Sequence, residues 1–109
     1  MTIATHTFFR GAAPTGNSLL HTAPIGMAEC ITHIAICNAT GSSQTASINL
    51  DAKPTTGGST VSVPLIASTT IAANTTTYVT LQQVIYDEET IFGSASSSSV
   101  HFHIAGFEI

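Results

Sequence analysis

The chain has 109 residues and carries an unusually low charge: 7% of its residues are charged, against roughly 25% in typical soluble domains. Arg10 and Lys53 are its two basic residues, and the formal net charge at pH 7 is −4. A protein that binds a polyanion needs several cations on one face, because neutralising phosphates supplies most of the affinity. We therefore expect no nucleic-acid partner. The length fits one domain with its own core, so residues 1–109 are expected to form a single domain.

Hydroxyl side chains take the place of the missing charges, since thirty residues are Ser or Thr. Disordered Ser/Thr tracts usually lack branched and aromatic residues, whereas here Ile, Val, Leu and Phe are interleaved throughout. The pattern indicates a folded protein with a neutral hydroxyl surface. Such a surface gives weak electrostatic protection against association, so we expect much of it to be covered by other protein.

The N-terminal stretch MTIATHTFFRGAAP has no basic region followed by a long apolar run, and no segment approaches the length of a membrane span. We therefore expect no secretory signal and no membrane partner. Phe8 and Phe9 are adjacent, so on an extended segment one can face the core while the other faces outward. Residues 1–10 are a candidate N-terminal arm, with Phe8 and Phe9 as candidate contacts to a subunit or shell. Half-covered surface aromatics are the equally weighted alternative.

SLLHT predicts a short strand, and the turn TAPIG separates it from a long strand, MAECITHIAICN. Cys30 and Cys37 lie seven residues apart on the long strand, which predicts opposite faces and a separation of roughly 20 Å or more. A disulfide needs Cα atoms within about 7 Å, so we expect two free thiols, as suits assembly in a reducing cytoplasm. Cys30 and His33 are likewise expected on opposite faces, which argues against a thiolate–imidazole pair.

In QTASINLD the apolar residues Ala46, Ile48 and Leu50 alternate with polar ones, which is typical of a half-buried strand. The loop KPTTGGS follows, and then the segment TVSVPLIA. Pro64 interrupts this segment and cannot donate a ladder hydrogen bond. The segment is therefore predicted to be an edge strand or to contain a bulge.

The segment TYVTLQQVIY alternates less regularly, but Val79 and Leu81 fit one face of a further strand. One short helical turn within LQQVIYDEET is the alternative. The acidic run 87–89 lacks the alternating oxygen spacing of a calcium loop. It favours a solvated turn that repels edge pairing.

The closing segment VHFHIAGFEI predicts a last strand that buries its apolar side chains and turns His101 and His103 outward. A His-x-His pair can supply two ligands to zinc, and His33 or a symmetry axis could supply more. No other His, Cys or acid lies at a spacing that points to a third ligand, so we expect no metal. The two histidines are instead expected to meet solvent or a subunit or shell interface.

Eight or nine short strands with turns about every ten residues predict an all-β fold, an antiparallel β-sandwich resembling a jelly roll with about eight strands. No Gly-x-Ser-x-Gly elbow frames a serine, and no glycine loop could cradle a phosphate. The sequence therefore predicts no catalytic residue, no cofactor and no enzymatic activity.

The order of turns and strands from residue 18 to residue 109 resembles a class of small virion proteins of tailed bacteriophages. The similar stretches are SLLHTAPIG, AECITHIAICNATGSSQTASINL, TTIAANTTTYVTLQQVIYDEETIFGSA and the final GFEI. The near absence of basic residues departs from that class, as does DEE where a Gly-Asp turn is more usual.

The resemblance implies a non-enzymatic structural protein with a β-sandwich fold. Low charge, a hydroxyl surface and multivalent attachment favour a capsid decoration (cement) protein. We expect a trimer that binds the major capsid protein on the virion head, assembled in the host cytoplasm. A protein of the tail, collar or baseplate is the first alternative. A host-glycan-binding module is the second, weakened because the chain has no Trp and two Tyr.

Overall fold

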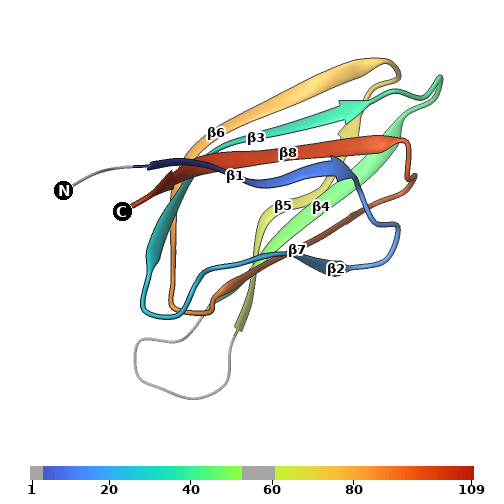
Figure 1. Cartoon of the computed structure of the whole chain (residues 1–109). Helices are drawn as coiled ribbons and strands as arrows, with labels where there is room; N and C mark the ends of the chain where they lie inside the picture. Colours follow the sequence, from blue (N-terminus) through green and yellow to red (C-terminus); the bar gives the residue numbers. More distant parts are fainter. Residues whose placement is uncertain (1–3, 53–60) are drawn as a thin grey trace.

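The computed structural model describes residues 4–52 and 61–109, which form eight β-strands (Figure 1). The strands are β1 (Ala4–Ala12), β2 (Ser18–Thr22), β3 (Ala28–Asn38), β4 (Gln44–Ala52), β5 (Val61–Ile71), β6 (Thr75–Tyr86), β7 (Thr90–Ala95) and β8 (Val100–Glu108). They form two stacked antiparallel sheets of four strands each, in the orders β1-β8-β3-β6 and β2-β7-β4-β5. The expected all-β sandwich is confirmed.

This strand order is that of a long hairpin wrapped around a barrel axis. The outermost strands of the chain pair with each other, β1 with β8, and the pairing continues inward through β2 with β7, β3 with β6 and β4 with β5. That arrangement is the jelly roll. The alternative helical turn within LQQVIYDEET is not formed, because β6 remains extended to Tyr86. Within the described ranges no helix is long and apolar enough to cross a membrane.

The core lies between the sheets and is built mainly from isoleucine. As predicted, Ala46, Ile48 and Leu50 of β4 point inward and are buried. The last strand also follows the prediction, because its inward side chains are fully buried while His101 is half-buried and His103 exposed. Full burial of one such side chain contributes about 1.5–3 kcal/mol. The large, fully buried apolar residues are Ile31, Ile34, Ile36, Ile48, Ile71, Ile85, Ile91, Val100, Phe102 and Ile104.

A β-bulge places both phenylalanines of β1 on the core side. The register against β8 shifts between Thr7 and Phe9, so Phe8 is the extra residue. Phe8 is 7% exposed, and Phe9 packs against the core with its ring edge-on to Phe102. Simple alternation would have turned one of them outward. Residues 4–10 thus belong to an edge strand of the sandwich, and residues 1–3 of the candidate arm lie outside the described residues.

A second bulge, at Thr32 in β3, changes the expected arrangement of the cysteines. Ile31 and Ile36 both lie in the core although an odd number of positions separates them, because the register shifts between Ile31 and His33. Cys30 and Cys37, each next to one of these isoleucines, therefore face the same outer side. The prediction of opposite faces was wrong for this pair and for Cys30 with His33. The prediction of free thiols is confirmed.

Strand β5 occupies the edge of the second sheet, as Pro64 predicts. Its register against β4 shifts on both sides of Ile48, and Ser68 adopts a positive φ of 45°. The edge is therefore irregular, which discourages pairing with another chain. The predicted loop KPTTGGS, including Lys53, lies outside the described residues.

The turn from β6 to β7 carries the chain from one sheet to the other with two residues in the left-handed region. The Glu89 amide donates to the Tyr86 carbonyl at 3.2 Å, and φ is +47° at Asp87 and +69° at Glu88. This combination is characteristic of a type I′ turn. The Asp87 carboxylate accepts a hydrogen bond from the Gly26 amide at 2.8 Å, and Glu89 accepts one from the Tyr86 amide at 2.9 Å. The side chains of Asp87 and Glu89 therefore stabilise this turn through hydrogen bonds to backbone amides.

Replacing Glu88 with glycine is expected to raise the free energy of unfolding by about 1 kcal/mol, because glycine removes the steric cost of a left-handed Glu. The 2.9 Å hydrogen bond from the Glu88 amide to the Ala23 carbonyl is retained. Thermal unfolding measures the change. The matched control is Glu88→Ala, which removes the charge but keeps the left-handed strain. An equal gain in both variants would show that charge, and not backbone strain, limits this turn.

Candidate functional surfaces

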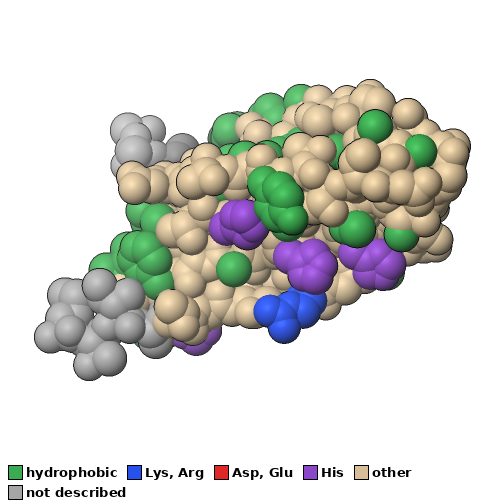
Figure 2. All heavy atoms as spheres, turned by 90° about the horizontal axis from the view of Figure 1, so that it is seen from above, with side chains coloured by type: hydrophobic (Ala, Val, Ile, Leu, Met, Phe, Trp, Pro, Cys, Tyr) green, Lys and Arg blue, Asp and Glu red, His purple; other side chains and the backbone are tan. Residues whose placement is uncertain are grey.

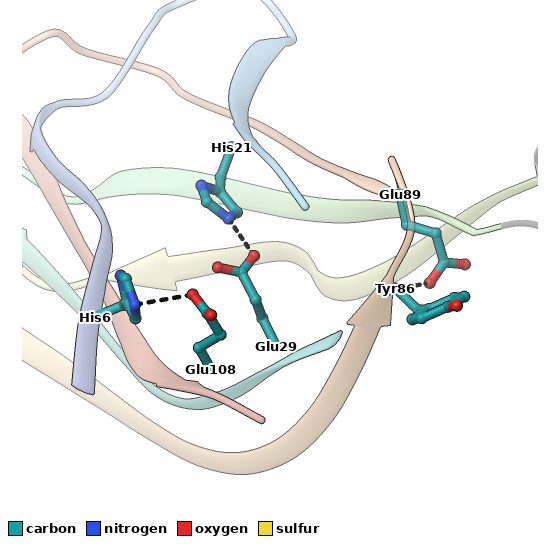
Figure 3. A network of polar contacts seen from close by, with 6 residues as sticks. All are labelled: His6, His21, Glu29, Tyr86, Glu89 and Glu108. Carbon is teal, nitrogen blue, oxygen red and sulfur yellow. Dashed lines mark hydrogen bonds and ion pairs between the residues drawn. The ribbon is translucent and has the colours of Figure 1, made fainter. Parts of the chain in front are cut away.

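Two carboxylates lie side by side at one end of the sandwich. Glu29, near the start of β3, pairs directly with Glu108, near the end of β8. Each has an imidazole partner from a neighbouring strand, shown in Figure 3: the Nε2 atom of His21 lies 2.7 Å from the Glu29 Oε1, and that of His6 lies 3.2 Å from the Glu108 Oε2. Phe8 lies next to both imidazoles, with its ring centroid 4.8 Å from that of His21 and 6.3 Å from that of His6. The cluster thus ties β1 and β2 to the central strands β3 and β8.

The His21–Glu29 pair is nearly enclosed, because the two side chains are 19% and 3% exposed. A carboxylate can remain in such a place only if it is hydrogen-bonded or paired. Acid–base chemistry on a substrate would need space beside the pair, and burial of Glu29 leaves none. We therefore assign the His21–Glu29 pair a structural role. Sequence reasoning missed it, although the short TAPIG turn between β2 and β3 brings residues 21 and 29 together.

Replacing His21 with alanine is expected to lower the free energy of unfolding by about 2–3 kcal/mol, because Glu29 would stay buried without its partner. Urea denaturation measures the loss. A His21→Leu/Glu29→Leu variant leaves neither side chain of the pair as a buried polar group without a partner, so its free energy of unfolding should lie close to that of the wild type. If the losses in the single variants His21→Leu and Glu29→Leu add up to the loss in the double variant, the two side chains are not coupled.

The outer face of the β1-β8-β3-β6 sheet carries most of the histidines. Across the sheet, Arg10 of β1 pairs with His103 of β8, and His103 pairs with Ala35 of β3. Two residues nearer the start of β8, His101 pairs with Cys37. His33 of β3 pairs with Ala105, two residues nearer the end of β8 than His103, and its ring centroid lies 5.7 Å from that of Tyr78 on β6. We call Arg10, His33, Tyr78, His101 and His103 the histidine face (Figure 2). His101 and His103 thus point outward as predicted.

A shallow depression of about 290 Å³ lies on the β2-β7-β4-β5 side of the molecule. The depression is lined almost entirely by hydroxyl and small apolar groups. Ser68 of β5 is one of the lining residues, and its backbone amide donates to the Ser47 hydroxyl at 3.0 Å. None of its lining residues is charged or aromatic. The lining residues are Thr15, Thr45, Ala46, Ser47, Ser68, Ser94, Ala95 and Ser96. The depression can offer hydrogen bonds to a polar group, but no acid, base or stacking surface.

The described residues bring no three metal-ligating side chains together in a way that could hold an ion. In particular, His33 is not joined to His101 and His103 in such a group. The depression and the carboxylate–imidazole cluster have no residue in common.

Comparison with known proteins gives a likeness of fold. No family model matches the chain, and no curated protein matches it. Among solved structures it is similar to the protein in the T13 particle of infectious bursal disease virus, with a TM-score of 0.60 and 7% identity over 98% of this chain. The VP2 subviral particle of the same virus gives 0.59 with 8% identity, and the virus of the Gx strain gives 0.55 with 12% identity.

These viral chains are much longer than this one. The present chain spans 30% of the protein in the T13 particle and 31% of VP2 in the subviral particle. At such low identity the likeness establishes a common architecture and does not transfer residues. That architecture, the eight-stranded sandwich of Figure 1, covers nearly the whole of the present chain.

Proposed function

We propose that this protein is a non-enzymatic structural component of a virus particle, and more specifically a decoration protein of a bacteriophage head. The observation that carries the proposal is the likeness of its whole jelly roll to proteins of assembled viral particles, at a TM-score of 0.60. The resemblance of its turns and strands to those of small tailed-phage virion proteins supports the narrower role. The absence of a metal-ligating group among the described residues fits a protein that works by contact.

The surface chemistry is consistent with cementing a shell. A decoration protein binds several neighbouring shell subunits at once, so each contact can be weak while the combined attachment is strong. A hydroxyl-rich surface of low charge can be buried with little desolvation of ions. The proposed partners are the major capsid protein and further copies of this chain, with a trimer as the favoured oligomer. The proposed location is the outer surface of the head.

Quantitative mass spectrometry of purified virions tests this proposal, after heads have been separated from tails. A decoration protein is expected in the head fraction at a copy number comparable to that of the major shell protein. A few copies confined to tails would assign it to the tail, collar or baseplate instead. Absence from both fractions would overturn the structural role.

A host-glycan-binding role has less support. Sugar sites commonly stack an aromatic ring against the sugar, and the depression on the β2-β7-β4-β5 side is lined by hydroxyl and methyl groups alone. The exposed tyrosines, Tyr78 and Tyr86, both lie on β6 of the other sheet. A glycan array without binding would exclude this role.

A further inference from the structure

The histidine face has an unusual charge composition. Within the described part of the chain it holds one permanent cation, Arg10, together with three histidines, and Figure 2 shows no Asp or Glu side chain among them. Tyr78 is 68% exposed beside His33. The face is therefore an open sheet surface that carries a single positive charge when the histidines are neutral and four when they are protonated.

The acids lie elsewhere on the molecule. All six are at the end of the sandwich where β3 begins and β8 ends (Figure 1). Glu29 and Glu108 face His21 and His6 there. Asp51, the second-last residue of β4, and the turn 87–89 complete the set. Glu88 is exposed in that turn, and the other three of these four acids are half-buried. We call Asp51 and residues 87–89 the acidic end.

We propose that the histidine face of one copy binds the acidic end of a second copy. The two surfaces carry opposite charge, and their positions on one rigid sandwich prevent them from meeting within a molecule. Their complementarity can therefore be satisfied only between molecules. Because the surfaces differ, the contact is head-to-tail, so a small closed ring such as a trimer forms if the rotation closes.

The contact should strengthen as the pH falls from 7.5 to 5.5. Histidine ordinarily changes its charge between pH 5 and 8, whereas exposed carboxylates keep theirs above about pH 5. The titratable and charged neighbours of the three histidines are few: Arg10 lies opposite His103, Cys37 opposite His101, and Tyr78 beside His33. None of these neighbours is a carboxylate, so protonation adds positive charge to the face that a second copy's carboxylates can neutralise.

Sedimentation equilibrium of the full chain at pH 7.5 and 5.5, in about 50 mM salt, tests the proposal. We expect the dissociation constant to fall roughly tenfold at pH 5.5, because each protonated histidine can form a surface charge pair across the contact. Raising the salt to about 0.5 M should reverse the change, since exposed pairs are screened. A wild-type protein that stays monomeric at both pH values would overturn the proposal without any variant being made.

Paired variants separate this contact from general association, which also rises as protonation brings the net charge of −4 towards zero. His33→Gln/His101→Gln/His103→Gln disables the face, and Asp51→Asn/Glu88→Gln disables the acidic end. Each should be monomeric alone at pH 5.5. Their mixture should form a one-to-one complex, because each variant retains the half that the other lacks.

His6→Gln is the matched control, because His6 pairs with Glu108 outside the histidine face. It should associate like the wild type. Circular dichroism establishes that every variant is folded. Association that persists in both separate variants, or a mixture that stays monomeric, would contradict a head-to-tail contact between these two surfaces. The result does not depend on where in a particle the protein is found.

Discussion

Replacing Gly106 with alanine is expected to lower the free energy of unfolding by at least about 3 kcal/mol, at the upper end of what overpacking costs. Gly106 lies in β8 between Ile31 of β3 and His6 of β1. A Cβ added there would overlap the Cys30 carbonyl oxygen and lie 2.9 Å from the Phe8 ring. The carbonyl belongs to the backbone of β3. It cannot move away without separating the two central strands of the sheet.

Gly41→Ala provides the matched control, because nothing lies within 4 Å of a Cβ at Gly41 and its φ is not positive. This variant should be neutral or slightly stabilising, since alanine restricts the unfolded chain. Urea denaturation of both variants measures the difference. Similar stability of Gly106→Ala and the wild type would mean that β3 and β8 can separate locally at the bulge without loss of packing.

Replacing Asn38 with alanine should cost about 3–4 kcal/mol. Asn38 is fully buried at the end of β3. Its amide nitrogen lies 2.8, 3.0 and 3.2 Å from the carbonyl oxygens of Ser42, Ile71 and Ala72, so its two N–H groups, one of them shared, donate to all three. Its oxygen accepts from the Thr40 amide and hydroxyl at 3.0 and 2.7 Å. One side chain thus joins the β3–β4 turn to the β5–β6 turn, and each buried group left unpaired costs about 1–3 kcal/mol.

Asn38→Asp separates hydrogen bonding from shape, because a carboxylate has the same size but cannot donate to three carbonyls. It should be at least as destabilising as alanine. Asn17→Ala, at an exposed position, should change the stability little. If Asn38→Asp retained wild-type stability, the donated hydrogen bonds would contribute nothing, and the two turns would be joined by packing alone.

Much of the fold could be predicted from the sequence, because regular alternation reports directly on which side chains face the core. This holds for β4 and β8, whose inward residues such as Ile48 and Phe102 were identified from their spacing. It also holds for the edge position of β5, where the lost donor of Pro64 sets the constraint. These features depend on neighbours one or two residues away.

The errors arose where one extra residue interrupts the alternation. The bulges at Phe8 and Thr32 lie against the same stretch of β8, residues 104–106, on its two sides. Where a bulge forms depends on the strand that pairs with it across the sheet. The local pattern of apolar and polar residues does not show which strand that is. After Thr32 every side chain changes face, which moved Cys37 to the side of Cys30.

The candidate site was only partly predictable for a similar reason. The outward direction of His101 and His103 follows from their own strand. The placement of Arg10 and Tyr78 in the same row as His103 depends on which strands become neighbours, and β1 lies beside β8 from the opposite end of the chain. The roles of Glu29, Asn38 and Gly106 likewise depend on contacts between distant segments. No periodicity signals such contacts.

The wrapped strand order also has a consequence for how the protein can be made. During synthesis β1 emerges first, but its only sheet neighbour is β8 (Val100–Glu108), which is translated last. Strand β3 similarly waits for β6 and β8, while β4 and β5 can pair as soon as both have emerged. Before β6 has emerged, the nascent chain can therefore hold little more than that hairpin, and the sandwich closes only once β8 is available, at the slow rate typical of distant strand pairing. Until then the apolar sides of both sheets stay open to chaperones and to other nascent copies on the same messenger.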